Sequence, residues 1–163
     1  MLWFKTLSLL LLLTVTACSD FRVRSLSDSE YNQIASIQVI SSTGRLGQIY
    51  TRQLKDKLMM NPGITPTHTL ESDLSVSSVS TLSVVGSSST LKKMTMSVSF
   101  KLTNLTTGEI ELKDAISTNA TLGAVSSYYG QDESETQGQE RLAGLLADRV
   151  ANRMQLFFIA RNN

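Results

Sequence analysis

The chain has 163 residues, with 15 lysine and arginine residues against 14 aspartate and glutamate residues. The formal net charge of +1 argues against a nucleic-acid partner, which requires a basic surface. Aromatic residues make up only 6% of the chain, and this composition suits exposed strands better than a ligand-gripping pocket. The length fits a single domain.

The first 17 residues have the pattern of an export signal. Lys5 is followed by a predominantly apolar run from Leu7 to Val15, which is too short to span a bilayer comfortably. Val15-Thr16-Ala17-Cys18 fits the bacterial lipobox, in which the cysteine receives a diacylglycerol and its freed amine takes a further acyl chain. We therefore expect removal of residues 1–17 and lipidation of Cys18.

Cys18 is the only cysteine of the chain, so it cannot form an intramolecular disulfide. The alternative is an ordinary signal peptide with a chance cysteine at the cleavage site. Each buried acyl CH₂ contributes roughly 0.8 kcal/mol, so several acyl chains hold a protein on a membrane without a transmembrane helix. Ser19 follows the cysteine, where an aspartate would commonly mark retention in the inner membrane. This favours the outer membrane.

Three segments follow from this pattern. Residues 1–17 form the lipoprotein signal peptide, residues 18–33 the lipidated N-terminus and linker, and residues 34–163 one α/β domain. From Asp20 to Tyr31 the sequence shows no clean period, which is why this stretch is interpreted as a linker.

The domain begins with a short strand at Ile37 and Val39 and continues with an amphipathic helix after Ser41-Ser42-Thr43-Gly44. Asn61-Pro62-Gly63 is expected to end that helix. Its apolar residues recur at helical spacing: Leu46, Ile49, Tyr50, Leu54 and Leu58.

Three strands follow, each with a period of two. Their even positions are mostly apolar: Leu74, Val76, Leu82 and Val84, then Met94, Met96, Val98, Phe100 and Leu102, then Ile110, Leu112, Ile116, Ala120 and Leu122. Their odd positions are polar, among them Ser75, Ser77, Ser97, Ser99, Lys101, Glu109, Glu111, Lys113, Ser117 and Asn119. The pattern predicts an antiparallel meander with one solvated face and one face covered by helices.

The last segment predicts a helix that begins at a capping box, with Ser134 as the cap and Gln137 three residues later. Its apolar stripe comprises Leu142, Leu145, Leu146, Val150, Met154, Phe157 and Phe158, and Ala143, Ala147 and Ala151 lie beside it. The predicted fold is α+β, a two-layer sandwich in which two helices pack on one face of a mostly antiparallel four-stranded sheet, in the order β-α-β-β-β-α.

The sequence predicts no catalytic residues, no metal site and no cofactor. A serine or cysteine hydrolase needs a base beside its nucleophile, and the only histidine, His68, lies in no nucleophile motif. We expect His68 to be a surface residue at a strand start. Glu109 and Glu111 are interpreted as a solvated strand end, and Asp132, Glu133 and Glu135 as charges near a helix N-terminus.

Lys92 and Lys93 form the one compact basic spot of the mature sequence. One interpretation is a solvated strand entrance that discourages edge pairing. The other is contact with the phosphate of an anionic lipid headgroup, which favours clustered cations.

Several segments resemble the LptE family, lipoproteins of the outer-membrane lipopolysaccharide translocon. They are Cys18-x-x-Phe21-Arg22, Val98–Leu102 leading into Thr106–Glu109, and Gln139–Ala143 through Leu146–Val150 to Arg153–Phe158. The resemblance covers essentially the whole mature chain. Val23-Arg24-Ser25 departs from it, since many members have Pro-Leu-Tyr there.

The resemblance implies a non-enzymatic outer-membrane lipoprotein that sits inside the barrel protein LptD, assists its assembly and takes part in lipopolysaccharide transport to the outer leaflet. Lipopolysaccharide would then be the ligand whose phosphates Lys92 and Lys93 contact. A periplasmic, lipid-anchored binding module for another envelope ligand, such as a glycan, is the alternative function.

Overall fold

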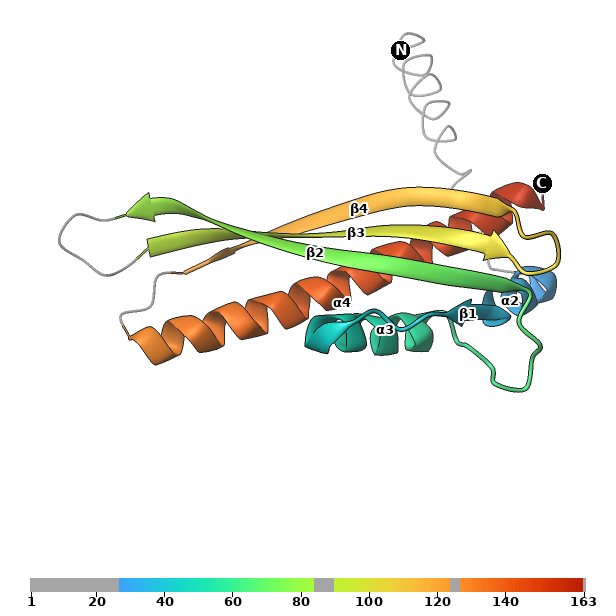
Figure 1. Cartoon of the computed structure of the whole chain (residues 1–163), viewed down its shortest axis with the longest axis horizontal. Coiled ribbons are helices and arrows are strands. Elements are labelled where there is room, and N and C mark those ends of the chain that lie inside the picture. The colour runs from blue at the N-terminus through green and yellow to red at the C-terminus, as the bar shows by residue number, and fades with distance from the viewer. Residues whose placement is uncertain (1–26, 84–89, 124–126, 163) are drawn as a thin grey trace, which may run out of the picture.

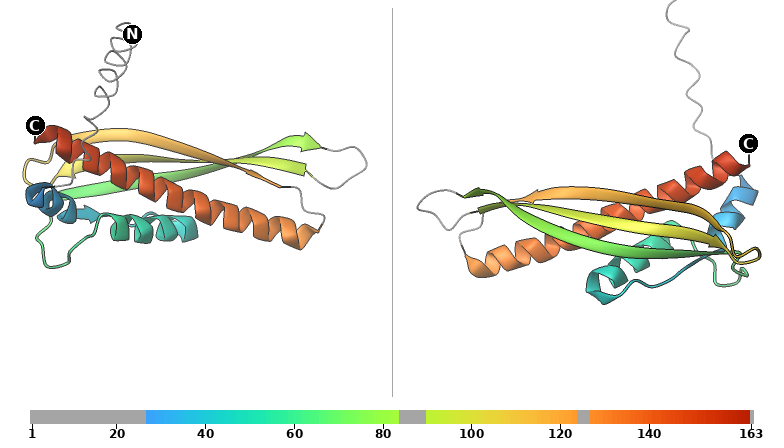
Figure 2. Two further views of the ribbon diagram at one scale, coloured as in Figure 1. Left: turned by 180° about the vertical axis from the view of Figure 1, so that it is seen from behind. Right: turned by 45° about the horizontal axis from the view of Figure 1, so that its top comes forward.

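The computed structural model describes residues 27–83, 90–123 and 127–162. In chain order the elements are α2 (Asp28–Ala35), β1 (Ile37–Val39), α3 (Gly44–Lys57), β2 (His68–Ser83), β3 (Thr90–Asn104), β4 (Ile110–Leu122) and α4 (Tyr128–Arg161). Figure 1 and Figure 2 show two layers, with the sheet on one side and α3 and α4 on the other. The predicted α+β class is confirmed, with one helix more than expected.

The sheet has the strand order β1-β2-β3-β4. The three long strands form the predicted antiparallel meander, whereas β1 pairs with β2 in parallel, from Ile37 opposite His68 to Val39 opposite Leu70. Because β1 has only three residues, most of the length of β2 lies at the edge of the sheet.

The alternation of β3 separates the two faces of the sheet as predicted. Its even residues from Met94 to Leu102 are almost fully buried, while Ser99 among them and Lys93 just before them are exposed. Helices α3 and α4 supply the other half of the core, with Tyr50, Leu54 and Phe158 completely buried. The sheet therefore has one face in the core and one face open.

Helix α4 is 34 residues long and begins earlier than predicted. Its N-cap is Ser127, whose hydroxyl accepts a hydrogen bond from the backbone N–H of Gly130 at 3.1 Å. The predicted capping box at Ser134 is therefore wrong: this residue lies inside the helix, because a cap two turns upstream already starts it. Glu135 is for the same reason a mid-helix residue.

The stripe of α4 is largely as predicted. The fully or nearly fully buried residues are Leu142, Ala143, Leu146, Ala147, Val150, Ala151, Met154 and Phe158. Leu145, of which 40% is exposed, and Phe157, which is half-buried, are the exceptions. Alanines on this face shorten the distance between α4 and its neighbours, and a Cβ built on Gly144 would come within 2.5 Å of the Gln53 side chain of α3.

Helix α3 ends before the predicted stop at Asn61. Leu58 is its C-cap, and Met59 then adopts a left-handed conformation with φ of 50°. Gly47 allows the start of α3 to lie close to the segment before it, because an added Cβ would lie 2.8 Å from the backbone of Ser42.

Helix α2 is absent from the sequence prediction, which interprets this stretch as linker. Ser27 and Glu30 form a capping box: the backbone N–H of Ser27 donates to the Glu30 carboxylate at 2.8 Å, and the Ser27 hydroxyl accepts from the Glu30 N–H at 3.4 Å. Ile34 belongs to the core, and α2 packs against α4. Helix α2 therefore lies beside the C-terminal end of α4 (Figure 1).

Candidate functional site

The open face of the sheet carries small polar side chains in cross-strand rows. Ser75, Ser97 and Ser117 lie side by side on β2, β3 and β4. The next rows are Ser77, Thr95 and Asn119 on one side, and Asp73, Ser99 and Ala115 on the other. These residues are exposed or half-buried, so the predicted solvated face is confirmed.

Charge gathers at the end of the open face near the β3–β4 turn. Lys101 lies between Glu71 and Lys113 on the neighbouring strands, and its Nζ is 2.9 Å from the Glu71 carboxylate. These residues, with Asp73 and Ser99, line an open cavity of about 240 Å³. A cavity of this size accommodates waters or a small polar group of a larger partner.

Lys92 and Lys93 do not form one basic spot, because successive side chains of a strand point to opposite faces. The Nζ of Lys92 forms an ion pair with the carboxylate of Glu135 on α4, and both side chains are half-buried. Lys93 is exposed on the open face, beside Val79 and Thr121. The hydrogen bond from Lys92 keeps the pKa of Glu135 below its usual value.

A β-bulge near the start of β4 changes the face of the sheet to which its first side chains point. Leu102 lies opposite Leu112 and Thr103 lies opposite Ile110, so Glu111 is an extra residue between them. Glu111 turns to the helix side, and Ile110 turns outward with 56% of it exposed. The prediction of a solvated Glu111 and an inward Ile110 is wrong, because a period of two holds only while both strands advance together.

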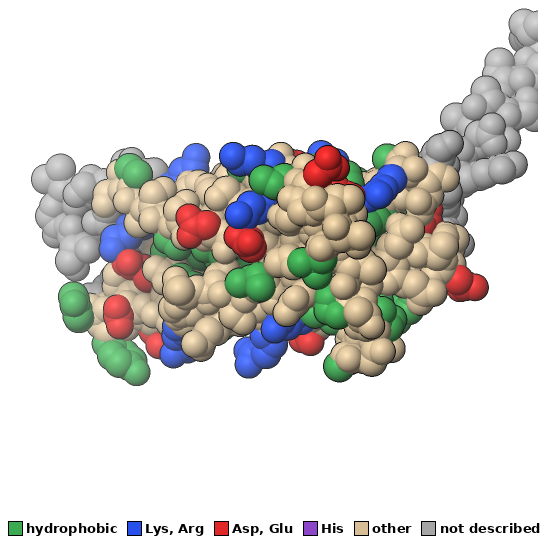
Figure 3. Space-filling view, turned by 45° about the vertical axis from the view of Figure 1, so that its right-hand side comes forward, with side chains coloured by type: hydrophobic (Ala, Val, Ile, Leu, Met, Phe, Trp, Pro, Cys, Tyr) green, Lys and Arg blue, Asp and Glu red, His purple; other side chains and the backbone are tan. Residues whose placement is uncertain are grey.

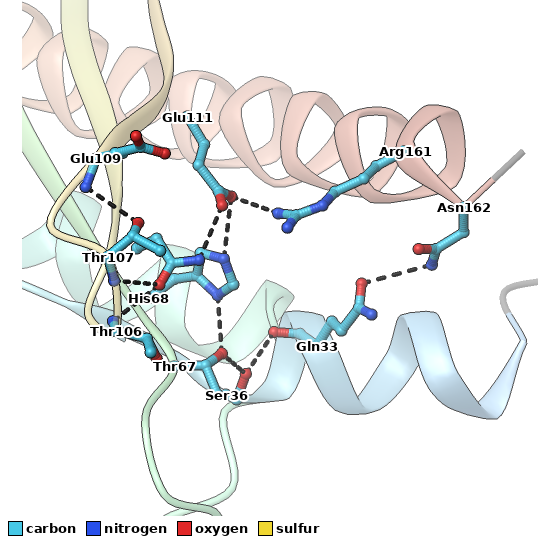
Figure 4. A network of polar contacts seen from close by, with 11 residues as sticks. Gln33, Ser36, Thr67, His68, Thr106, Thr107, Glu109, Glu111, Arg161 and Asn162 are labelled. Carbon is cyan, nitrogen blue, oxygen red and sulfur yellow. Dashed lines mark hydrogen bonds and ion pairs between the residues drawn. The ribbon is translucent and has the colours of Figure 1, made fainter.

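Glu111 is the centre of a polar network that joins four elements (Figure 4). Its carboxylate accepts from Arg161 of α4 at 2.5 Å and from Asn104 of β3 at 2.9 Å, and it lies 3.1 Å from Nε2 of His68 on β2. The other ring nitrogen of His68 is 2.8 Å from the hydroxyl of Thr67. The network thus ties the sheet to the C-terminal end of α4.

The same network continues to α2. The hydroxyls of Thr67 and Ser36 are 2.7 Å apart, and that of Ser36 donates to the carbonyl of Gln33 at 2.8 Å. The chain of polar contacts is therefore continuous from the Gln33 carbonyl to the Glu111 carboxylate.

His68 is not a surface residue, in contrast to the prediction. It is 6% exposed and its ring meets that of Phe158 edge-on, with centroids 5.4 Å apart. No histidine is visible on the face drawn in Figure 3, in line with this burial. The succession of Thr67, His68 and Glu111 has the residue types of a nucleophile, a base and an orienting acid. However, each of them is held by further packing partners, which fits a structural junction better than a reacting centre.

Two opposing influences act on the pKa of Glu111. Partial burial raises this pKa, whereas the hydrogen bond from Asn104 and the charge of Arg161 lower it, and their sum leaves the pKa below its usual value. The Arg153 guanidinium likewise lowers the pKa of Asp114 on β4 by donating a hydrogen bond at 2.8 Å. Both carboxylates therefore stabilise the fold as anions.

Cys18, the predicted lipidation site, lies outside the described residues. Within residues 27–83, 90–123 and 127–162, no helix combines the length and the apolar character required to cross a membrane. Hydrophobic side chains on the face drawn in Figure 3 form small groups between polar atoms and charges of both signs.

Solved structures with a similar fold include bacterial lipoproteins. A predicted lipoprotein from Caulobacter crescentus CB15 has a TM-score of 0.65 at 21% identity, covering 80% of this chain and 96% of that one. A minor lipoprotein from Acinetobacter baumannii has a TM-score of 0.56 at 12% identity, covering 74% and 88% of the two chains. The rare lipoprotein B from Shewanella oneidensis has a TM-score of 0.53 at 16% identity, covering 78% and 97%.

The family follows from the sequence. The model of the LptE lipopolysaccharide-assembly family matches residues 31–154, which is most of the chain. The chain therefore belongs to the LptE family, and lipopolysaccharide assembly is the process in which this family takes part. No curated protein sequence matches the chain significantly.

Proposed function

We propose that this protein is an outer-membrane lipoprotein, anchored through acylated Cys18, that assists assembly of the LptD barrel, plugs it and takes part in lipopolysaccharide transport to the outer leaflet. It would act as a binding and assembly subunit rather than as an enzyme. The observation that carries the proposal is the family match over residues 31–154, and the polar sheet face supplies a surface suited to the role.

The physical support comes from the open face. The lumen of an outer-membrane barrel is polar, so a plug must present polar groups without burying unpaired charges. The rows around Ser97 offer hydroxyls that both donate and accept hydrogen bonds. Asp73 is the charged residue of the adjacent row, and Lys101 in the row beyond it is paired with Glu71. Such a face presents few charges for a partner to cover.

Photo-crosslinking tests where the partner lies. Photoreactive side chains at Ser97, Ser99 or Ser117 on the open face should capture the LptD barrel. The same group at Leu146, which is fully buried against the domain's own sheet, is the control and should give no such product.

A second experiment separates this function from its alternative. Depletion of the protein should reduce the amount of correctly assembled barrel. Unchanged barrel assembly together with no crosslink from any open-face position would contradict the proposal, and it would favour a lipid-anchored module for another envelope ligand.

We further propose that the basic strand end binds lipopolysaccharide phosphates, with the exposed Lys93 in direct contact. Lys92 has Glu135 as its partner, so it would contribute only by exchanging that partner for a phosphate. Lys93→Glu should weaken lipopolysaccharide binding to the purified protein without changing its circular dichroism. The matched control is Lys113→Glu, at the opposite end of the open face. Equal binding by Lys93→Glu and the parent protein would remove Lys93 from the site.

The anchor is tested by intact-mass measurement of membrane-extracted protein. We expect the loss of residues 1–17 together with the mass of fatty acyl groups. Cys18→Ala should release the domain from membranes in a folded form, because the core cluster consists of residues from Ile34 to Phe158. An unmodified thiol at Cys18 in extracted protein would falsify this proposal.

A further inference from the structure

The charged end of the open face, near the β3–β4 turn, differs chemically from the middle of that face. The two middle rows, around Ser97 and Thr95, consist of hydroxyl side chains and one amide, that of Asn119. Hydroxyls both donate and accept hydrogen bonds, so these rows distinguish poorly between partners and between orientations of one partner. Charged groups discriminate more strongly, because a wrong orientation brings like charges together.

Two lysines meet directly at the charged end. Lys101 of β3 lies opposite Lys113 of β4, and like charges at directly opposed positions of two strands repel each other. Glu71 of β2 offsets only the first of them, with its carboxylate 2.9 Å from the Nζ of Lys101. An ammonium group has three donors, so Lys101 keeps donors for a second acceptor. Among the described residues, none forms an ion pair or hydrogen bond with the Nζ of Lys113.

Asp73 is the unpaired anion of the same cluster. It lies two residues after Glu71 on the same face of β2, so two carboxylates are neighbours while only Glu71 has a cation as its partner. Within residues 27–83, 90–123 and 127–162, no group forms an ion pair or hydrogen bond with the carboxylate of Asp73. Asp73 and Lys113 are both exposed and both line the cavity of about 240 Å³. The cavity thus has an unpaired anion towards β2 and an unpaired cation towards β4.

The separation of these two charges indicates what kind of molecule satisfies both. Neighbouring strands lie about 4.8 Å apart, and a strand advances about 3.3 Å per residue. Lys113 is two strands and two residues away from Asp73, which places their Cα atoms about 12 Å apart. A free amino acid carries both of its backbone charges on one carbon atom, so it covers only one end of the cavity. Two side chains of one polypeptide can cover both ends.

We propose that the charged end of the open face binds an acidic and a basic side chain of the partner polypeptide, the acidic one between Lys101 and Lys113 and the basic one against Asp73. This inference rests on the function proposed above, in which a barrel lumen covers the open face. It adds which groups set the orientation of the domain in the lumen.

The chemistry of both contacts is that of charge-assisted hydrogen bonds. A partner carboxylate accepts from Lys113 and from the remaining donors of Lys101, and its charge offsets the repulsion between the two lysines. A partner ammonium or guanidinium donates to Asp73, which is the only unpaired carboxylate among the residues that line the cavity. The reversed orientation would set like charges against each other at both ends. The serine rows then add contact area without selecting an orientation.

Charge reversal in the full-length chain in membranes tests the contact, with the amount of LptD barrel that co-purifies as the readout. Lys113→Glu and Asp73→Lys should each reduce this amount about tenfold, because each sets a like charge against the partner. Lys113→Arg keeps the charge and should retain the barrel. Arg52→Glu is the matched control, since Arg52 is exposed on α3 in the helical layer, and it should behave as the parent chain.

An exchange of the two charges separates a partner contact from an effect within the domain. Asp73→Lys combined with Lys113→Asp has the net charge of the parent. If the two residues acted only on each other, the exchange would restore the barrel, whereas a partner contact predicts a loss at least as large as in either single variant. Lys113→Glu should not lower the melting temperature, because it removes the repulsion from Lys101, so lost barrel would not mean a lost fold.

The outcomes distinguish this contact from the proposed function. If the parent chain co-purifies with no barrel, the proposed function and the contact are both wrong. If the parent retains the barrel and the two reversals retain it equally, or if the exchange restores it, only the charged contact is wrong. Loss in both reversals and in the exchange, with retention in Lys113→Arg and Arg52→Glu, is the expected result.

Discussion

The two faces of the sheet are built from adjacent residues that differ completely in their surroundings. Phe100 is 3% exposed and packs under the helices, while Ser99 beside it is exposed on the open face. One face stabilises the domain and the other remains available to partners. The difference teaches that the effect of a substitution should alternate along each strand, and that this alternation should reverse at the bulge of β4.

The largest effect is expected from a charge placed under the covered face. Leu146→Asp buries an unpaired carboxylate against the sheet, which should cost about 4 kcal/mol, a large part of the stability of a small domain. Ser97→Asp on the open face is the control and should unfold close to the parent temperature. Similar thermal unfolding of the two variants would disprove the assignment of faces.

The second-largest effect on stability is expected from acid, because Glu111, Asp114 and Glu135 all have lowered pKa values in the folded protein. A carboxyl group whose pKa is lower when folded stabilises the fold above its unfolded pKa, and this contribution is lost as the pH falls through the folded pKa. Thermal stability should therefore fall as the pH drops below about 4.5, the ordinary value for glutamate. Glu111→Gln should flatten the acid limb of this profile.

Substitutions at the bulge of β4 give a finer test of the difference between the covered and the open face. Glu111→Gln keeps the size of the side chain but removes the anion that holds Arg161 and His68, so it should cost about 2 kcal/mol, measured by urea unfolding. Glu109→Gln, an exposed neighbour two positions away, should cost almost nothing. Equal costs would mean that the bulge does not turn Glu111 into the core side.

The smallest expected effect distinguishes Lys92 from Lys93. Lys92→Ala removes the partner of Glu135 and should lower stability by about 1 kcal/mol, whereas Lys93→Ala should leave the melting temperature unchanged. Lipopolysaccharide binding should be weakened more by Lys93→Ala than by Lys92→Ala. A larger loss of stability from Lys93→Ala would contradict the placement of these two side chains.

The candidate site was only partly predictable. The polar open face follows from the alternation of serine with apolar residues, and the structure confirms it at Ser75, Ser97 and Ser117. The interpretation of Lys92 and Lys93 as one basic spot used proximity in sequence, although the strand period that places them on opposite faces was available from the same residues. Nothing local could have revealed Glu135 as the partner of Lys92, since the two lie 43 residues apart.

The sequence by itself determined the export signal pattern, the three alternating strands and the apolar stripe of α4, because each of these depends on a period or motif within one segment. Only the tertiary structure decided the bulge at Glu111, the burial of His68 and the packing of α2 against α4. Each of these depends on residues from different elements meeting in space: Glu111 finds His68 43 residues before it and Arg161 50 residues after it. A local pattern records which face a side chain prefers, but the partners on that face are set by the packing of the whole domain.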